Sequence, residues 1–232
     1  MKRNQSGFTL IEIAIVLVII GLLLGGVLKG QELINSAKVK DLANDFKNIP
    51  VLIYGYQDKF RSLPGDDPNA IGHVGTVANA APGAGLLGNG TLNGTWDSVT
   101  ATNETVVFWE QVRRAGLSTG LTTVSVAGGL LDPYFPANTL GGRIGIQGNL
   151  DTADAPKPIA GIPGVYVICS ANIPGKFARQ LDVTLDDGAT NTGSMRATTA
   201  AAGTAAVVPV GQPVATVTPA NDDTLYTVCM GV

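Results

Sequence analysis

The most regular hydrophobic pattern in the chain is an unbroken apolar run near its N-terminus. Between residues 8 and 28, Glu12 is the only charged residue. As an α-helix this stretch would be about 30 Å long, which matches the hydrocarbon core of a bilayer. Lys2 and Arg3 precede the run. The positive-inside rule therefore predicts a cytoplasmic N-terminus and an extracytoplasmic remainder.

After the apolar run, hydrophobic residues recur at steps of three and four positions. This spacing predicts one apolar stripe along a helix, with most of the charged residues off the stripe. The stripe consists of Val39, Leu42, Phe46, Ile49, Ile53, Tyr56 and Phe60. Pro50 falls inside it and should kink the helix without ending it, because the pattern continues. We expect a long helix over residues 8–63, with a transmembrane part (8–28) and an amphipathic part (29–63).

Residues 64–232 combine short periodic segments with many turn residues and predict a globular α+β head. Two segments, 104–117 and 173–188, have the spacing of short amphipathic helices. Residues 72–105 are rich in Gly, Ala, Asn and Thr and predict a long loop. Strand candidates separated by Gly, Pro and Asn favour an antiparallel sheet. They are residues 123–127, 143–147, 164–169, 206–210, 214–218 and 224–230.

The chain has two cysteines, Cys169 and Cys229, each in a strand-like run. In an exported head they predict one disulfide, which would tie the strand holding Cys169 to the last strand. The alternative is a pair of buried free thiols. On the chain-entropy model, closing a loop of about 60 residues stabilises a fold by roughly 4 kcal/mol.

Composition and isolated motifs argue against nucleic-acid binding and catalysis. The net charge is −3 and 14% of the residues are charged, so no basic surface is expected. The single histidine, His73, excludes a multi-histidine metal site and is expected to be an exposed loop residue. A GxGxxG match at 83–88 does not follow a strand, and a GxSxG match at 116–120 has no histidine after it. We expect no enzyme; the remote alternative is a membrane-anchored extracytoplasmic enzyme.

Glu12 is the residue that a simple membrane anchor leaves unexplained. A carboxylate in the bilayer costs a few kcal/mol and needs a positive partner. A secretory signal peptide would have a shorter apolar run and a small-residue cleavage site. Cleavage after Gly7 would instead give Phe8 a free α-amino group, which an axially displaced neighbouring copy could present to Glu12. The carboxylate would then set the register between identical helices.

The stretch KRNQSG-FTLIEIAIVLVIIGLL resembles the N-terminus of type IV prepilins and type II secretion pseudopilins. These families have a short basic leader ending in Gly, then Phe-Thr-Leu-Ile-Glu, then an apolar helix. The resemblance implies a leader of residues 1–7, cleavage after Gly7, N-methylation of Phe8, and pairing of Glu12 with a neighbour's N-terminus. It also implies the pilin-like lollipop, in which the long helix packs on an antiparallel sheet in a head of residues 64–232. LPGDDP, FWEQVRRAGL and GGRIGI resemble heads of prepilin-like proteins.

The same resemblance implies a structural subunit of a type IV pilus-like filament. Its partners would be a prepilin peptidase, an assembly ATPase with its platform protein, and further copies of the chain. The subunit would cross the inner membrane once before assembly and then lie in an extracellular or periplasmic filament. A secretion pseudopilin and a minor pilin are the alternatives, and roles in adhesion, motility or secretion stay open.

Three acidic residues are the metal candidates in the head. Asp186 and Asp187 lie at the C-terminal end of the helix predicted at 173–188, where carboxylates oppose the helix dipole. They either cap a turn or, together with Asp182, bind Ca²⁺ through oxygen ligands. Some pseudopilins have a calcium site in the head, so Ca²⁺ would favour a pseudopilin, whereas the C-terminal disulfide favours a pilin. No other cofactor is expected.

Overall fold

A computed structural model of the chain describes residues 10–75, 87–124, 133–150, 157–199 and 213–232. By its internal contacts the chain divides into two compact units, Met1–Lys38 and Val39–Val232. Helix α1 (Leu10–Phe60) contributes residues to both units. The strand candidate at 206–210 lies outside the described residues.

The described part of the first unit is the N-terminal portion of α1, up to Lys38. Its large hydrophobic side chains between residues 10 and 28 are exposed, from 46% for Ile20 to 92% for Leu10. This is the reverse of a soluble helix, which hides an apolar face against a core. The N-terminal portion of α1 therefore presents apolar surface around its whole circumference.

The C-terminal portion of α1 belongs to the second unit and has one buried face. Each stripe residue from Val39 to Tyr56 is at most 7% exposed, and Phe60 is half-buried, so the predicted stripe is confirmed. Pro50 lies inside α1, which continues to Phe60, and a kink there stays a prediction. The helix ends where Arg61 takes a φ of 58°, a left-handed conformation that α-helical geometry does not allow.

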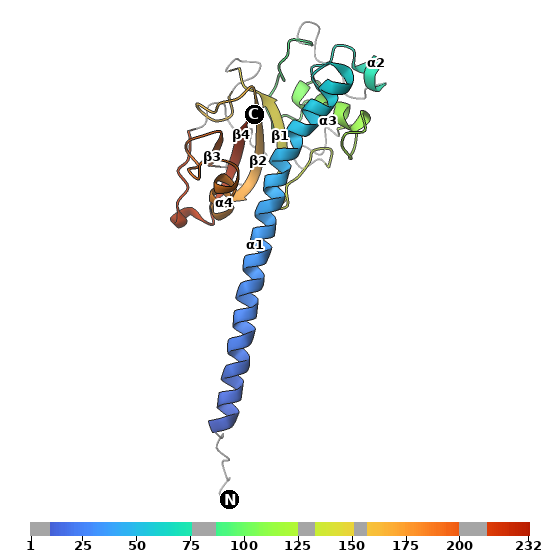
Figure 1. Cartoon of the computed structure of the whole chain (residues 1–232). Helices are drawn as coiled ribbons and strands as arrows, with labels where there is room; N and C mark the ends of the chain where they lie inside the picture. The colour runs from blue at the N-terminus through green and yellow to red at the C-terminus, as the bar shows by residue number, and fades with distance from the viewer. Residues whose placement is uncertain (1–9, 76–86, 125–132, 151–156, 200–212) are drawn as a thin grey trace, which may run out of the picture. The chain divides into compact units, whose positions relative to one another are not determined.

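The second unit is built around a four-stranded antiparallel sheet in the order β1-β2-β4-β3 (Figure 1). Its strands are β1 (Ile144–Gly148), β2 (Tyr166–Pro174), β3 (Met195–Thr199) and β4 (Leu225–Gly231). Cys169 of β2 lies directly opposite Cys229 of β4, and the two form a disulfide. The α+β class, the antiparallel sheet and the bond between β2 and the last strand agree with the sequence predictions.

The two faces of the sheet belong to two separate hydrophobic clusters, because successive strand residues point to opposite faces. Ile168 packs in the larger cluster, together with buried residues of α1, α3 (Glu104–Arg114) and α4 (Gly175–Leu185). Val167 and the disulfide face the smaller cluster, which Trp96 and two isoleucines, Ile159 and Ile162, complete. Two short elements, α2 (Ala70–Val74) and the 3-10 helix η2 (Pro219–Asn221), lie in the connections.

Some sequence predictions for the head are wrong. Strand β3 was not predicted, whereas residues 214–218, which were, form no strand. That segment still runs beside β3, because the Ala215 N–H donates to the Ala197 carbonyl at 2.8 Å and Thr198 Oγ1 donates to the Pro213 carbonyl at 3.0 Å. Of the candidate at 123–127, residues 123 and 124 are not in a strand and the rest lie outside the described residues.

Candidate functional site

The N-terminal candidate site is centred on Glu12, in the first turn of α1. Aligned peptide dipoles give the start of a helix a partial positive charge, so a carboxylate there gains roughly 0.5 kcal/mol. The next cation along the helix, Lys29, pairs with Glu32 at 2.7 Å and lies about 25 Å farther along the axis. Gly7 and Phe8 lie outside the described residues, so cleavage and methylation there stay predictions.

The apolar surface of α1 around Glu12 is long enough to span a bilayer. Within the described residues, α1 is the one helix whose length and composition suit a membrane span, and no residue of its most apolar window is buried. An exposed apolar surface of this kind needs lipid or other apolar helices around it. The geometry therefore offers a site of association, with one carboxylate placed at its beginning.

The acidic candidates come together where α4 ends. One carboxylate oxygen from each of Asp182, Asp186 and Asp187 lies within 4.8 Å of the other two. Asp182 is fully buried, Asp186 is half-buried and Asp187 is exposed. Burial, followed by the charges of Asp187 and Asp186, raises the pKa of Asp182 to about 6. The structure thus brings together all three acids that the sequence picked out.

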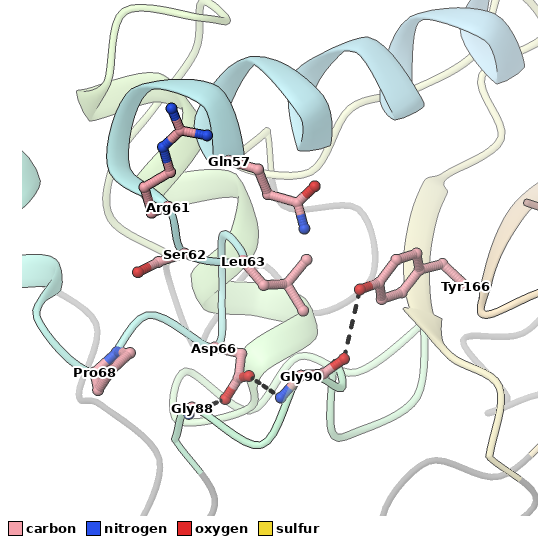
Figure 2. A pocket seen from close by; sticks show the side chains of 9 residues that line it. All are labelled: Gln57, Arg61, Ser62, Leu63, Asp66, Pro68, Gly88, Gly90 and Tyr166. Carbon is pink, nitrogen blue, oxygen red and sulfur yellow. Dashed lines mark hydrogen bonds between the residues drawn. The ribbon is translucent and has the colours of Figure 1, made fainter.

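A cavity of about 540 Å³ opens beside the C-terminal end of α1 (Figure 2). It is lined by Gln57, Arg61, Ser62, Leu63, Asp66, Pro68, Gly88, Gly90 and Tyr166. The carboxylate of Asp66 accepts backbone N–H bonds from Gly88, from Asn89 at 3.2 Å and from Gly90 at 2.6 Å. The Tyr166 hydroxyl reaches the Gly90 carbonyl at 3.5 Å. Asp66 therefore shapes the loop at 88–90, and its lone pairs are taken up by the backbone.

The structure corrects the expectation that His73 is an exposed loop residue. His73 lies on α2, its side chain is 24% exposed, and its Nδ1 lies 2.7 Å from Asp67 Oδ2. The same oxygen accepts the Tyr56 hydroxyl at 2.7 Å, and the imidazole stacks on Phe60. The other ring nitrogen faces Asn69 at 3.3 Å. Among the described residues, neither ring nitrogen bonds to a serine, threonine or cysteine, so His73 fastens α2 to the end of α1.

A further buried acid, Glu104, begins α3 and is fully buried. One of its carboxylate oxygens accepts the Asn93 N–H at 2.7 Å, and the other has no hydrogen-bond partner among the described residues. Burial is the main cause that raises the pKa of Glu104 to about 7. Sequence reasoning missed Glu104, as well as the anchoring roles of Asp66 and Asp67. An Asp-Asp pair between two prolines is a common turn signal, but it does not identify the distant backbone that it binds.

Comparison with protein families finds one match. The model of the prokaryotic N-terminal methylation motif matches residues 2–28. These residues include Glu12 and the exposed apolar surface of α1, so the match and the geometry converge on one segment. Neither the curated proteins nor the solved structures contain a match to the chain. The conclusions about the head therefore depend on its own geometry.

Proposed function

We propose that this chain, which carries at residues 2–28 the N-terminal methylation motif typical of type IV prepilins and pseudopilins, is a structural subunit of a type IV pilus-like filament. The observation that carries the proposal is the coincidence of that motif with the N-terminal portion of α1, whose large hydrophobic side chains between residues 10 and 28 are exposed. Such a helix can be held in a bilayer and then buried among identical helices. A heterologous contact of this kind generates an open-ended polymer.

In the proposed pathway a prepilin peptidase cuts after Gly7 and Phe8 becomes the methylated N-terminus. An assembly ATPase and its platform protein then move the subunit from the inner membrane into the filament. In the low dielectric between packed helices, Glu12 is best stabilised by the N-terminal amine of a neighbouring subunit. Because each helix has one amine and one such carboxylate near its start, the pair fixes the axial step between neighbours.

The first test replaces Glu12 and measures filament assembly. Glu12→Ala should leave cleavage intact and lower the yield of sheared filaments at least tenfold, because an amine left unpaired between apolar helices is costly. Glu12→Asp, which keeps the charge, serves as the matched control and should keep most of the yield. Filament yield by electron microscopy and processing by mass spectrometry are the two readouts. Normal assembly of Glu12→Ala would falsify the register role.

A second candidate function is a subunit of a periplasmic secretion pseudopilus. The disulfide between β2 and β4 favours a pilin, whereas a calcium site in the head would favour a pseudopilin. Localisation decides between them: surface fibres that can be sheared from cells support the pilus, and subunits confined to the periplasm support the pseudopilus. In both cases the mature N-terminus should be a methylated Phe8; a mature chain that starts at Met1 would contradict both.

A further inference from the structure

The cavity beside the C-terminal end of α1 has the size and the mixed lining of a ligand site. Its volume of about 540 Å³ lies in the range of small-molecule sites in proteins. The Gln57 amide and the Leu63 side chain point toward Tyr166, and Arg61 lies at the end of α1 (Figure 2). The cavity thus combines apolar surface with a few polar groups, which is typical of a site that binds a small ligand.

Arg61 supplies an unpaired positive charge at this cavity. Its side chain is exposed and forms no ion pair or hydrogen bond with another described residue, including Asp58 one turn before it. Among the described residues that line the cavity, the only acid is Asp66, which is 2% exposed and accepts the backbone N–H groups of Gly88 and Gly90. The charge that a ligand meets is therefore positive. It suits a carboxylate, which a guanidinium binds through two parallel hydrogen bonds.

The backbone at Arg61 is an independent sign that this side chain has a role. Its φ of 58° is a left-handed conformation, which glycine adopts without strain and which most often places glycine or asparagine at the end of a helix. Among the described residues, Asn172 is the only other non-glycine residue with a positive φ, and asparagine tolerates this conformation. Strained residues of the kind seen at Arg61 cluster at ligand sites. The strain is accounted for if the guanidinium is needed at the cavity.

The uncharged groups of the cavity suit hydroxyl groups better than a peptide backbone. The Gln57 amide has no hydrogen-bond partner among the described residues, and the Tyr166 hydroxyl has a long one, the Gly90 carbonyl at 3.5 Å. An amide and a phenol both donate and accept hydrogen bonds, as a sugar hydroxyl requires. An extended peptide would instead need free backbone groups in the wall. The N–H groups of Gly88 and Gly90 are already donated to Asp66.

We propose that this cavity binds a carboxylated sugar of the uronic acid class, with the sugar carboxylate on Arg61. Gln57 and Tyr166 bind the sugar hydroxyls, and Leu63 contacts the apolar C–H groups of the ring. Gly90 keeps the opposite wall open, because a Cβ built on it would have no atom within 4 Å. This inference concerns the head alone and stands whether or not the chain forms filaments.

The test titrates the full processed chain in detergent with sodium glucuronate at about pH 7, where the sugar carboxyl is ionised. Saturation-transfer NMR detects ligand protons in contact with the protein and should give a Kd of about 1 mM or tighter, an ordinary affinity for a ligand of this size. Glucose, which lacks the carboxylate, should bind about tenfold more weakly or worse. A blocked Asp-Gly dipeptide, which has the carboxylate but not the hydroxyls, should also bind more weakly than glucuronate.

Two variants separate ligand binding from folding and from general charge. Arg61→Gly should weaken glucuronate binding about tenfold or more, because charge-assisted hydrogen bonds are lost. The same variant should unfold at an equal or higher temperature, because glycine relieves the left-handed backbone. Lys47→Gln removes the same charge from an exposed residue of α1 that does not line the cavity, so this matched control should bind glucuronate as the unmodified chain does.

Three results would overturn the proposal. The first is an equal glucuronate affinity of Arg61→Gly and the unmodified chain. The second is an affinity for glucose or for the dipeptide as high as that for glucuronate. The third is the lack of any saturation transfer at about 10 mM glucuronate, about ten times the expected Kd.

Discussion

Glu104 illustrates how the position of a single side chain sets its ionisation. In the unfolded chain its pKa is near the ordinary value of 4.5, and burial in the folded head raises it to about 7. Between these two values the folded chain binds a proton that the unfolded chain does not. The contribution of Glu104 to stability is therefore full below about pH 4.5 and is lost as the pH rises through about 7.

The corresponding prediction concerns Glu104→Gln. Glutamine cannot ionise, so the variant does not lose stability as the pH rises. Relative to the unmodified chain, its unfolding free energy should be higher at pH 8 than at pH 4, by up to about 3 kcal/mol. Chemical denaturation at the two pH values measures this difference. Thr105→Val, at the next buried residue of α3, is a non-titrating control that should change the unfolding free energy by the same amount at both pH values. A pH-independent effect of Glu104→Gln would show that folding leaves the pKa of this carboxyl at its ordinary value.

At the residue scale, the sequence predicted functional residues whose role depends on their own segment. It did not predict the surroundings of residues that are set by tertiary contacts. Glu12 and the two cysteines stand out within their own segments, so they could be singled out directly. The sequence also grouped Asp182 with Asp186 and Asp187, because one helical turn brings them together. It could not show that Asp182 is fully buried, since this depends on how α4 packs. His73 was misjudged for the same reason: Asp67 and Phe60, which hold it, act through the tertiary fold.

At the element scale, the disulfide joins the two central strands of the sheet, β2 and β4. Its half-cystines are 60 positions apart, and closing such a loop restricts the unfolded chain by roughly 4 kcal/mol on the entropy model. Cys169→Ala together with Cys229→Ala should therefore lower the unfolding free energy by about 2–5 kcal/mol. A reducing agent should lower the urea midpoint of the unmodified chain and leave that of the double variant unchanged. Equal midpoints for the oxidised and reduced chain would contradict this prediction.

The elements differ in how far the sequence could predict them. The α1 stripe was predictable because its period of three and four repeats over many turns. Strand β3 is short, and its sequence MRATT has no clear alternation; it exists because it pairs with β4 and buries Met195 and Ala197. Residues 214–218 alternate like a strand but lie between Pro213 and Pro219, and they contact β3 through few backbone hydrogen bonds. Tertiary pairing thus decides which short β-like segment becomes a strand.

At the scale of the whole molecule, the chain divides into units that need different surroundings. In the first unit the apolar side chains of residues 10–28 are exposed, and none of that helix window is buried. In the second unit the buried stripe begins at Val39 and contributes to the main core. The first unit therefore offers an exposed apolar surface, whereas the core of the head contains residues from 39 onward. Sequence patterning predicted this change of character along one continuous helix.

This division predicts how truncated chains behave. A chain of residues 35–232 should stay monomeric without detergent and unfold at nearly the same urea concentration as the full chain in detergent, because the deleted side chains are not part of the head's core. A chain of residues 46–232 also loses Val39, Leu42 and Ala43, all buried. Its unfolding free energy should fall by more than about 3 kcal/mol, since each large core side chain removed costs 2–5 kcal/mol. Size-exclusion chromatography and urea unfolding measure the two effects. If 35–232 unfolded as easily as 46–232, the apolar half of α1 would have to stabilise the head.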